Sequence, residues 1–441
     1  PTAYIAERCV RIMMEAGILP DGALQLVVGG VGDLFDHLSG QDYVGFTGSA
    51  ATAAKLRAHP AVIERSTHFT AEADSLNASV LAPSAGPDSA EMDLFVREVA
   101  KEMCVKAGQK CTAIRRALVP RAHLEPVIEK LRDRLQTIAM GNPRNEKVRL
   151  GPLASLDQKR ELDKAIAALS EGSDVAYGDR PELLDADWDK GAFAAPLVLV
   201  NQDPTARACH EVEPFGPVAT LIPYEGVDEA VDFVARGGGS LVTSVFAKSA
   251  DDARDLTLGI APYNGRVLVV NETCGKTSTG HGSPLPHLVH GGPGRAGGGE
   301  ELGGVRGVKH YLQRTALQGS PDMLTAVTGT YVAGATRKEG EHPFRKCFED
   351  LEIGDSVLTG SRTITLEDIE RFADLSGDRF YAHMDEEAAK ASPIFEGRVA
   401  HGYFVVSMAA GLFVEPSPGP VLANYGLDHC RFTTPVYPGD E

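Results

Sequence analysis

Apolar residues recur along the chain with two different spacings, one typical of helices and one typical of strands. Recurrence every three to four residues predicts helices over 4–16, 31–38, 50–56 and 92–105. Short apolar runs bounded by Gly, Pro or polar residues predict strands over 24–28, 43–46, 78–81 and 117–119. Because strand and helix alternate, we expect a parallel sheet of the doubly wound kind.

The pattern continues through the middle of the chain and then changes. It predicts helices over 126–138 and 158–169, and strands over 218–223 and 267–270. Residues 280–304 form a loop rich in Gly and Pro that carries His281, His287 and His290. Three histidines suggest a metal site, but no Asp, Glu or Cys stands at ligand spacing. A loop that faces the substrate and hydrogen-bonds to it is the favoured interpretation, and no metal is predicted.

The last part of the chain has a pattern of its own. Residues 320–341 are typical of a helix followed by a polar linker, and Pro343 opens a new unit. A helix N-capped by Thr365 is predicted there, with Asp368 at its third position. The elements predicted in this unit are helices over 365–373 and 401–412 and strands over 421–428 and 430–436.

Composition narrows the class of protein. The 441 residues suffice for about three domains of the usual size. With 43 basic and 61 acidic residues, the net charge of −18 argues against nonspecific binding of nucleic acid. The seven cysteines are scattered without a Cys-x-x-Cys pair, as is typical of reduced cytoplasmic thiols. No apolar run reaches the roughly 18 residues that cross a membrane.

The segment Lys106–Arg116 holds the first candidate for chemistry, Cys111. A helix leads into a turn that presents the cysteine, and a short strand follows. A thiol reacts only as a thiolate, so it needs positive neighbours, a helix dipole or a nearby base. Taken alone, however, a lone intracellular cysteine fits a small buried side chain better.

Two further candidates come earlier in the chain. Thr47-Gly48-Ser49-Ala50 opens a helix, where free N–H groups and a hydroxyl suit a phosphate, although a Ser N-cap has the same spelling. Glu72 stands in a loop of small, mostly uncharged residues, a setting that can raise the pKa of a carboxyl group. A solvated glutamate is the plainer interpretation of that residue by itself.

Four ordered motifs change the interpretation of Cys111 and Glu72, because together they resemble the aldehyde dehydrogenase superfamily. They are Phe46-Thr47-Gly48-Ser49, Glu72, Gly108-Gln109-Lys110-Cys111 and Glu213-Pro214-Phe215-Gly216-Pro217. The resemblance covers roughly residues 1 to 320. It implies that Cys111 is the nucleophile and Glu72 the general base. It also implies that Phe46 and Ser49 lie on the nucleotide side and that Glu213 and Phe215 contact the nicotinamide riboside.

The resemblance also decides between two glutamates. Glu301-Leu302-Gly303-Gly304 spells the superfamily's base motif better than Glu72-Ala73-Asp74-Ser75 does. In the family, however, the base precedes the cysteine by a few tens of residues, as Glu72 does and Glu301 does not. The departure at 73–75 puts the shape of that loop in question rather than the base.

Some features that the resemblance implies are absent from the sequence. The chain begins without Met or a signal peptide and stops at Glu441, so we expect that both ends are cut from a longer protein. The superfamily's oxyanion Asn and cofactor-binding Lys are expected upstream of Pro1, together with half of the nucleotide fold. The segment that separates NADP from NAD is expected there too.

The last unit suggests different chemistry. Asp378 and His383 are five positions apart in a loop, and they can hold a water between them if the loop folds back. The alternative is an Asp turn and a surface His. With Gly402 at a helix start, the pattern resembles the MaoC-like, (R)-specific enoyl-CoA hydratases of hot-dog fold. The resemblance implies that Asp378 and His383 are catalytic and that the Gly402 N–H polarises a thioester carbonyl.

This chain departs from the hydratase motif at one point. The family usually has Asn-Pro where Phe380-Tyr381 stands here, which implies a substrate other than a linear enoyl chain. The match covers residues 343 to 441, and the later strands of the hot-dog sheet are expected to lie beyond the end of the chain.

The order of the two units resembles the bifunctional ring-opening enzymes of bacterial phenylacetate degradation. The resemblance implies a CoA-thioester substrate, hydrolytic opening of oxepin-CoA, and oxidation of the resulting semialdehyde to 3-oxo-5,6-dehydrosuberyl-CoA with NADP, NAD being possible. It also implies a cytoplasmic homo-oligomer of dimers assembled into a hexamer. Two alternatives stay open, namely a fused dehydrogenase and hydratase of another acyl-CoA pathway, and a non-catalytic assembly subunit.

The predicted fold class is therefore an α/β aldehyde dehydrogenase fold followed by a partial α+β hot-dog domain. The predicted divisions are the C-terminal part of a Rossmann-like dinucleotide-binding domain (1–75), a catalytic α/β domain (76–300), an oligomerisation strand (301–320), a linker (321–342) and the N-terminal part of a MaoC-like domain (343–441).

Overall fold

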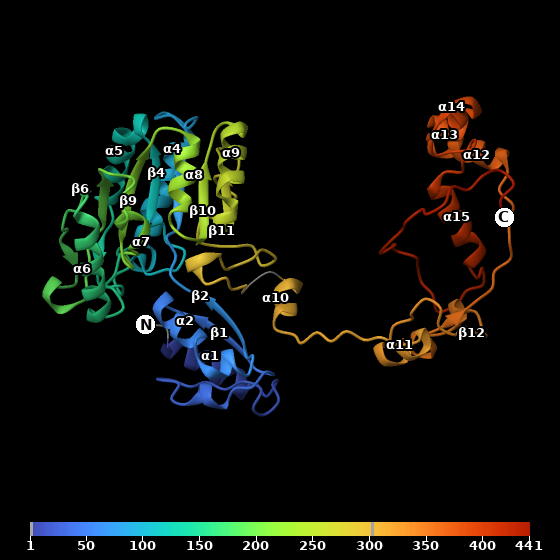
Figure 1. The fold of residues 1–441 in the computed structure, drawn as a ribbon, viewed down its shortest axis with the longest axis horizontal. Helices are drawn as coiled ribbons and strands as arrows, with labels where there is room; N and C mark the ends of the chain where they lie inside the picture. The colour runs from blue at the N-terminus through green and yellow to red at the C-terminus, as the bar shows by residue number, and fades with distance from the viewer. Residues whose placement is uncertain (1–2, 301–303) are drawn as a thin grey trace. The chain divides into compact units, whose positions relative to one another are not determined.

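A computed structural model describes residues 3–300 and 304–441, and its contacts divide them into two units (Figure 1). The first unit spans residues 1–313 and the second 314–441. Glu301, the rejected alternative for the general base, lies outside the described residues.

A seven-stranded sheet forms the centre of the first unit. Its order is β11-β10-β3-β4-β9-β8-β6. All neighbours are parallel except β6 and β8, which are antiparallel. The strands are β3 (Ala78–Leu81), β4 (Arg116–Pro120), β6 (Ser173–Tyr177), β8 (Leu197–Asn201), β9 (Val218–Tyr224), β10 (Ser240–Phe246) and β11 (Asn264–Val270). The predicted strands over 78–81, 117–119, 218–223 and 267–270 are confirmed.

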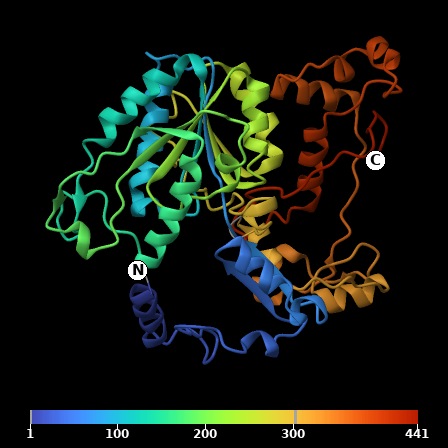
Figure 2. The same cartoon turned by 60° about the vertical axis from the view of Figure 1, so that its left-hand side comes forward.

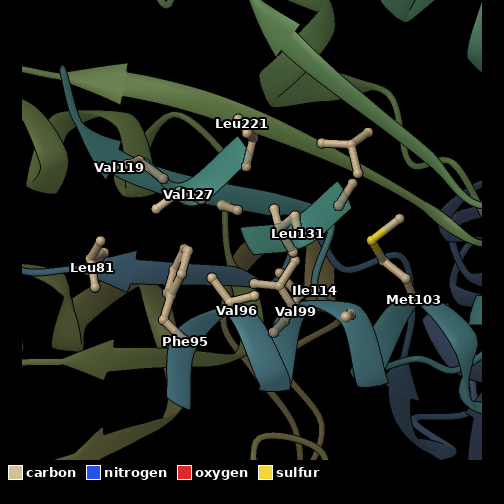
Figure 3. Close-up of a cluster of buried hydrophobic side chains, with 14 of the residues drawn as sticks. Leu81, Phe95, Val96, Val99, Met103, Ile114, Val119, Val127, Leu131 and Leu221 are labelled. Atoms are coloured by element: carbon tan, nitrogen blue, oxygen red, sulfur yellow. The ribbon is translucent and has the colours of Figure 1, made fainter. Parts of the chain in front are cut away.

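Helices cover both faces of this sheet (Figures 1 and 2). Side chains of α4 and α5 pack with one set of strand residues, among them Leu81, Val119 and Leu221 (Figure 3). Their neighbours in sequence, such as Val80 and Leu118, pack on the other face against α8 and α9. Consecutive strand residues thus point to opposite buried faces, which explains why these strands are apolar throughout. The helices are α4 (Ala90–Cys104), α5 (Leu124–Leu135), α6 (Leu156–Ser170), α7 (Ala208–Glu211), α8 (Val227–Ala235) and α9 (Ala250–Ile260).

A smaller parallel sheet precedes the large one in sequence. Strands β1 (Tyr43–Thr47) and β2 (His68–Glu72) pair in register, with Thr47 opposite Glu72. Helix α2 (Ala50–Arg57) follows β1, and α3 (Pro60–Ile63) leads towards β2. The Ser49 side chain accepts a hydrogen bond from the Thr52 N–H, so it is the N-cap of α2.

The first forty residues depart from the prediction in part. Helix α1 (Ala3–Glu15) matches the predicted helix over 4–16. The strand predicted over 24–28 is absent, and only a 3-10 turn (Leu34–His37) forms within the helix predicted over 31–38. An apolar run becomes a strand only when a neighbouring strand supplies its hydrogen bonds, and these residues have no such neighbour in the described structure.

The same reason applies to the strand predicted over 301–320. Its described residues are 304–320. They include helix α10 (Val305–His310) and form no strand. A strand that crosses to another subunit receives its hydrogen bonds from that subunit, so within one chain its backbone groups pair locally instead. The assignment of residues 301–320 to oligomerisation stays a prediction.

The second unit is mainly helical. Its elements are α11 (Pro321–Thr328), β12 (Lys338–Glu339), β13 (Asp355–Ser356), α12 (Leu366–Ser376), α13 (Tyr381–Met384), α14 (Glu386–Ala391) and α15 (Gly402–Phe413). Thr365 and Asp368 form a reciprocal capping box at α12, as predicted. A small core joins Ile364, Ile369 and Phe404.

One expectation for the second unit is wrong. The strands predicted over 421–428 and 430–436 are absent, because the described residues offer them no sheet to join. The segment 321–342 carries α11 and β12, and β12 pairs with β13. Its assignment as a linker stays a prediction.

A left-handed turn connects α4 to the cysteine segment. Lys106, Ala107 and Gly108 have φ values of 54°, 55° and 69°. Left-handed backbone costs roughly 1–2 kcal/mol for each residue that carries a Cβ. At Gly108 a Cβ would also lie 2.1 Å from the Gly216 carbonyl oxygen. The turn therefore brings the cysteine segment into backbone contact with the Glu213–Pro217 motif.

Replacement of Gly108 by Ala should destabilise the protein by about 1–3 kcal/mol, because the new methyl group pushes the two loops apart. Urea unfolding of the variant measures this loss. Gly86→Ala is the matched control, since a Cβ at Gly86 meets nothing within 4 Å. Equal unfolding midpoints for the two variants would contradict the close approach.

Candidate active sites

A cavity of about 560 Å³ in the first unit gathers most of the predicted dehydrogenase residues. Ser49, Glu72, Cys111, Glu213 and Phe215 all line it, although they come from distant parts of the sequence. Phe46 does not line it. Its ring packs instead with the small apolar cluster of Ala53, Ala71 and Ala73 beneath the cavity.

Cys111 is half-buried at the edge of this cavity. Burial, as the largest cause, and the neighbouring Glu72 carboxylate together raise the pKa of its thiol to about 12, while the Thr112 N–H and Lys110 act in the opposite direction. In this state the thiol keeps its proton at neutral pH. A proton acceptor stands beside it, because Glu72 hydrogen-bonds the thiol.

Glu72 is buried at the end of β2, with only 3% of its side chain exposed. Its Oε2 lies 3.0 Å from Nε2 of His290. A carboxylate oxygen of Glu72, the Cys111 sulfur and a ring nitrogen of His290 all lie within 4.8 Å of one another. The structure therefore brings the predicted nucleophile and the predicted base together, and it adds an imidazole to them.

Arg115 has a structural role that sequence reasoning missed. Its side chain is 1% exposed and donates to the carbonyl oxygens of Lys110 (3.3 Å) and Gly216 (3.0 Å). Its Nε lies 3.7 Å from Glu213 Oε1, and its guanidinium stacks over Phe215 at 5.3 Å. One buried cation thus joins the cysteine segment to the Glu213–Pro217 motif. The local signal for this role is a pair of arginines within an apolar run.

Asn77 was also missed. It is fully buried, and its Nδ2 donates to the carbonyl oxygens of Cys111 (2.7 Å) and Ala113 (3.0 Å). Its Oδ1 accepts from the Val242 N–H at 3.2 Å. The amide therefore fixes the backbone on the C-terminal side of the cysteine to the neighbouring strand β10.

Glu213 has an unusual environment for a carboxyl group. Burial raises its pKa to about 7, although Arg115 lowers it. The Ser75 N–H donates to it at 3.3 Å. Near neutral pH this group is therefore divided between a charged acceptor and a neutral hydrogen-bond donor.

The three histidines of the 280–304 loop do not gather. His281 is fully buried against Ser244 (2.6 Å), and burial lowers its pKa well below the usual range. His287 is exposed, and His290 contacts Glu72. Among the described residues, the three histidines form no metal-binding group with one another, and only His290 belongs to a candidate group, together with Glu72 and Cys111.

In the second unit, the loop between α12 and α13 folds back and brings Asp378 and His383 together. A carboxylate oxygen of Asp378, a ring nitrogen of His383 and a ring nitrogen of His401 all lie within 4.8 Å of one another. The His383 and His401 rings stack with centroids 3.8 Å apart. His383 Nδ1 lies 2.8 Å from the Val399 carbonyl, and His401 Nε2 lies 2.9 Å from the Asp378 carbonyl. His401 is the member of this cluster that sequence reasoning did not assign.

Gly402 begins α15 next to this cluster. Its N–H belongs to the first helical turn, where backbone donors have no acceptor within the helix. A Cβ at Gly402 would meet the Phe432 ring at 2.5 Å. Phe380 and Tyr381, which replace the expected Asn-Pro, are exposed beside the loop.

The fold and the paired thiol and carboxylate define an aldehyde dehydrogenase domain. The chain belongs to the aldehyde dehydrogenase family, whose model matches residues 1–317, and residues 349–441 match the MaoC-like domain. An aldehyde dehydrogenase domain is thus fused to a MaoC-like domain. Among the described helices, none has the length and apolar character needed to span a membrane.

Individual relatives agree with the family. Protein MaoC of Klebsiella aerogenes is 50% identical over 294 residues, which cover 66% of this chain and 86% of that protein. The 3,4-dehydroadipyl-CoA semialdehyde dehydrogenase of Aromatoleum evansii is 45% identical over 296 residues, which cover 66% of this chain and 58% of that protein.

Solved structures share the fold. Betaine aldehyde dehydrogenase of Staphylococcus aureus, in complex with NAD⁺, is 26% identical with a TM-score of 0.59. The match covers 69% of this chain and 57% of that one. This chain therefore spans little more than half the length of that enzyme and of the Aromatoleum evansii relative.

Alkylation by iodoacetamide should test the environment of the thiol. Because the pKa of Cys111 is raised to about 12, its labelling rate should rise about tenfold for each pH unit between 7 and 9. Glu72→Gln removes a negative charge and should therefore lower the thiol pKa and speed labelling at fixed pH.

Peptide mapping separates Cys111 from the other cysteines, and the exposed Cys347 serves as the internal reference. Unchanged labelling of Cys111 in the Glu72→Gln variant, with Cys347 also unchanged, would contradict the assigned contact.

Proposed function

We propose that the first unit oxidises an aldehyde through Cys111, with Glu72 as general base. The observation that carries this proposal is the pairing of thiol and carboxylate within one cavity that Glu213 and Phe215 also line. A buried carboxylate beside a thiol is suited to take its proton, and the thiolate is the reactive form.

The residues divide the reaction into two halves. Glu72 first accepts the thiol proton, and the Cys111 sulfur then bonds to the aldehyde carbon. Loss of hydride from that carbon leaves a thioester on Cys111. Glu72 gives up that proton and then takes one from a water molecule, whose oxygen attacks the thioester; a carboxylic acid is released, and the leaving thiolate takes the proton back from Glu72.

A nicotinamide cofactor supplies the hydride acceptor when it is bound. The cavity fits its riboside end, because the Phe215 ring is 37% exposed and Glu213 offers a carboxyl group close to Cys111. We expect Glu213 and Phe215 to hold the riboside, with Ser49 and Phe46 on the nucleotide side. The family and its NAD⁺-bound structures support a nicotinamide cofactor. NADP, rather than NAD, rests on the resemblance to the ring-opening enzymes.

The substrate is proposed to be a CoA-linked semialdehyde. The Aromatoleum evansii relative is named as a dehydrogenase of such a compound. For this protein we propose the semialdehyde derived from oxepin-CoA, which oxidation converts to 3-oxo-5,6-dehydrosuberyl-CoA. We further propose a cytoplasmic homo-oligomer in which residues 301–320 contact a partner subunit.

The second unit is proposed to open the oxepin-CoA ring. One water adds to the ring carbon that carries the oxygen, and cleavage of the carbon–oxygen bond then gives the aldehyde. Asp378 and His383 lie close enough together to take a proton from that water and deliver one to the substrate. We expect the Gly402 N–H to hydrogen-bond the thioester carbonyl, which would stabilise the negative charge that develops there.

The two activities should separate cleanly by mutation in the whole protein. Cys111→Ala removes the nucleophile, so NAD(P)H formation should vanish while oxepin-CoA is still consumed. Asp378→Ala or His383→Ala should have the opposite effect, with simple aldehydes still oxidised at near-normal rate. Absorbance at 340 nm and chromatography of CoA esters report the two reactions. Loss of both activities in one folded variant would contradict separate sites.

Glu72→Gln should slow steady-state aldehyde oxidation by a factor on the order of 10² or more, the scale of a lost general base. Glu91→Gln is the matched control, because Glu91 is an equally buried glutamate that accepts from the Glu272 N–H and does not line the cavity. If Glu301→Gln slowed the reaction and Glu72→Gln did not, the assignment of the base would be wrong.

A further inference from the structure

His290 has no role in the mechanism derived above, yet it touches the proposed base. Its Nε2 lies 3.0 Å from the Glu72 carboxylate, and both groups have atoms within 4.8 Å of the Cys111 sulfur. The arrangement is a buried carboxylate with a thiol and an imidazole as neighbours. What the imidazole does there depends on how firmly it is held and on how it reaches solvent.

The loop that carries His290 is bonded to the strand that carries Glu72. The Gly299 N–H donates to the Ala71 carbonyl at 3.1 Å, and the Ala73 N–H donates to the Ala296 carbonyl at 3.1 Å. These two bonds lie on either side of Glu72 in sequence. Backbone pairing, rather than a flexible side chain, therefore sets the place of the loop relative to the base.

Glycines make this close approach possible. A Cβ at Gly297 would lie 2.2 Å from the Ala71 carbonyl oxygen, and one at Gly299 would lie 2.6 Å from the same atom. Gly291 directly follows His290 and passes close to Gly299. A Cβ at Gly291 would lie 1.8 Å from the Gly299 carbonyl oxygen. The loop is thus folded tightly onto itself and onto β2, with His290 at its start.

Exposure differs between the two members of the pair. The Glu72 side chain is 3% exposed and that of His290 is 16% exposed. In the proposed cycle, formation of the thioester leaves a proton on Glu72, which must be lost before Glu72 can activate the water. Glu72 has little direct access to water, whereas its imidazole neighbour is more open to it.

We propose that His290 is the proton-transfer partner of Glu72 in hydrolysis of the thioester. The neutral carboxyl group gives its proton to Nε2, and the imidazole releases another from Nδ1, so that Glu72 returns to its charged form and one proton leaves the site. Imidazole suits this step because it has a donor and an acceptor nitrogen on one ring. The inference rests on the proposed role of Glu72 as general base.

Two substitutions separate proton transfer from simple positioning. His290→Ala removes both functions. His290→Gln keeps a side chain that donates a hydrogen bond to Glu72 but cannot carry a proton. Both variants should turn over aldehyde about 100-fold more slowly, the lower end of the range for general acid–base catalysis. The first, stoichiometric burst of NAD(P)H should persist, because it precedes hydrolysis.

Added imidazole supplies the readout that a purely structural role would not move. It should restore part of the steady-state rate to His290→Ala and should leave the Cys111→Ala variant inactive. His123→Gln is the matched control, since His123 is a partly buried histidine of the same unit that bonds the Pro83 carbonyl (3.2 Å) and does not line the cavity. Its steady-state rate should equal that of the unmodified protein.

Three outcomes would overturn the inference. They are a normal rate in His290→Gln, a normal rate in His290→Ala, and a slow, folded His290→Ala variant that imidazole does not accelerate. Failure of the proposed function would look different, because the unmodified protein would then form no NAD(P)H from any aldehyde. Unfolding of His290→Ala would leave the Gln variant and its burst as the deciding measurement.

Discussion

The dehydrogenase site depends on one buried cation. Arg115 is almost completely shielded from water, and taking an ion out of water costs several kcal/mol. Here two carbonyl oxygens, the Glu213 carboxyl group and the face of Phe215 offset that cost. Because these partners belong to two separate loops, the guanidinium makes these contacts only when both loops are in place. The contact between Gly108 and Gly216 then follows from the same arrangement.

The elements that could be predicted from the sequence are those whose packing and hydrogen-bond partners lie within the described chain. Strands such as β3 and β4 are apolar on both faces, since helices cover both sides of the sheet. The strand predictions that are wrong, at 24–28 and 421–436, concern apolar runs with no neighbouring strand in the described structure. Local sequence reveals that a segment is apolar, but strand formation also requires hydrogen-bond partners from elsewhere in the chain.

The candidate sites show the same division. Cys111, Glu72, Asp378 and His383 could be predicted because each stands in a short motif, and the structure brings each pair together. Arg115, Asn77, His290 and His401 could not, because their roles come from contacts with residues distant in sequence. A buried arginine or asparagine has no local signature that distinguishes it from a solvated one. Only the fold shows which polar groups face one another.

The bonds between the 291–299 loop and β2 affect the protein while it is being made. Synthesis releases Cys111 well before residues 213–216, and residues 290–299 follow later still. Until those segments dock, the cysteine of the nascent chain is an ordinary thiol, with a pKa of roughly 8.5. Once the site has closed, burial and Glu72 raise that pKa to about 12. Oxidants in the cell therefore find the thiol most reactive during translation, whereas in the finished fold Cys111 reacts only when its proton is removed.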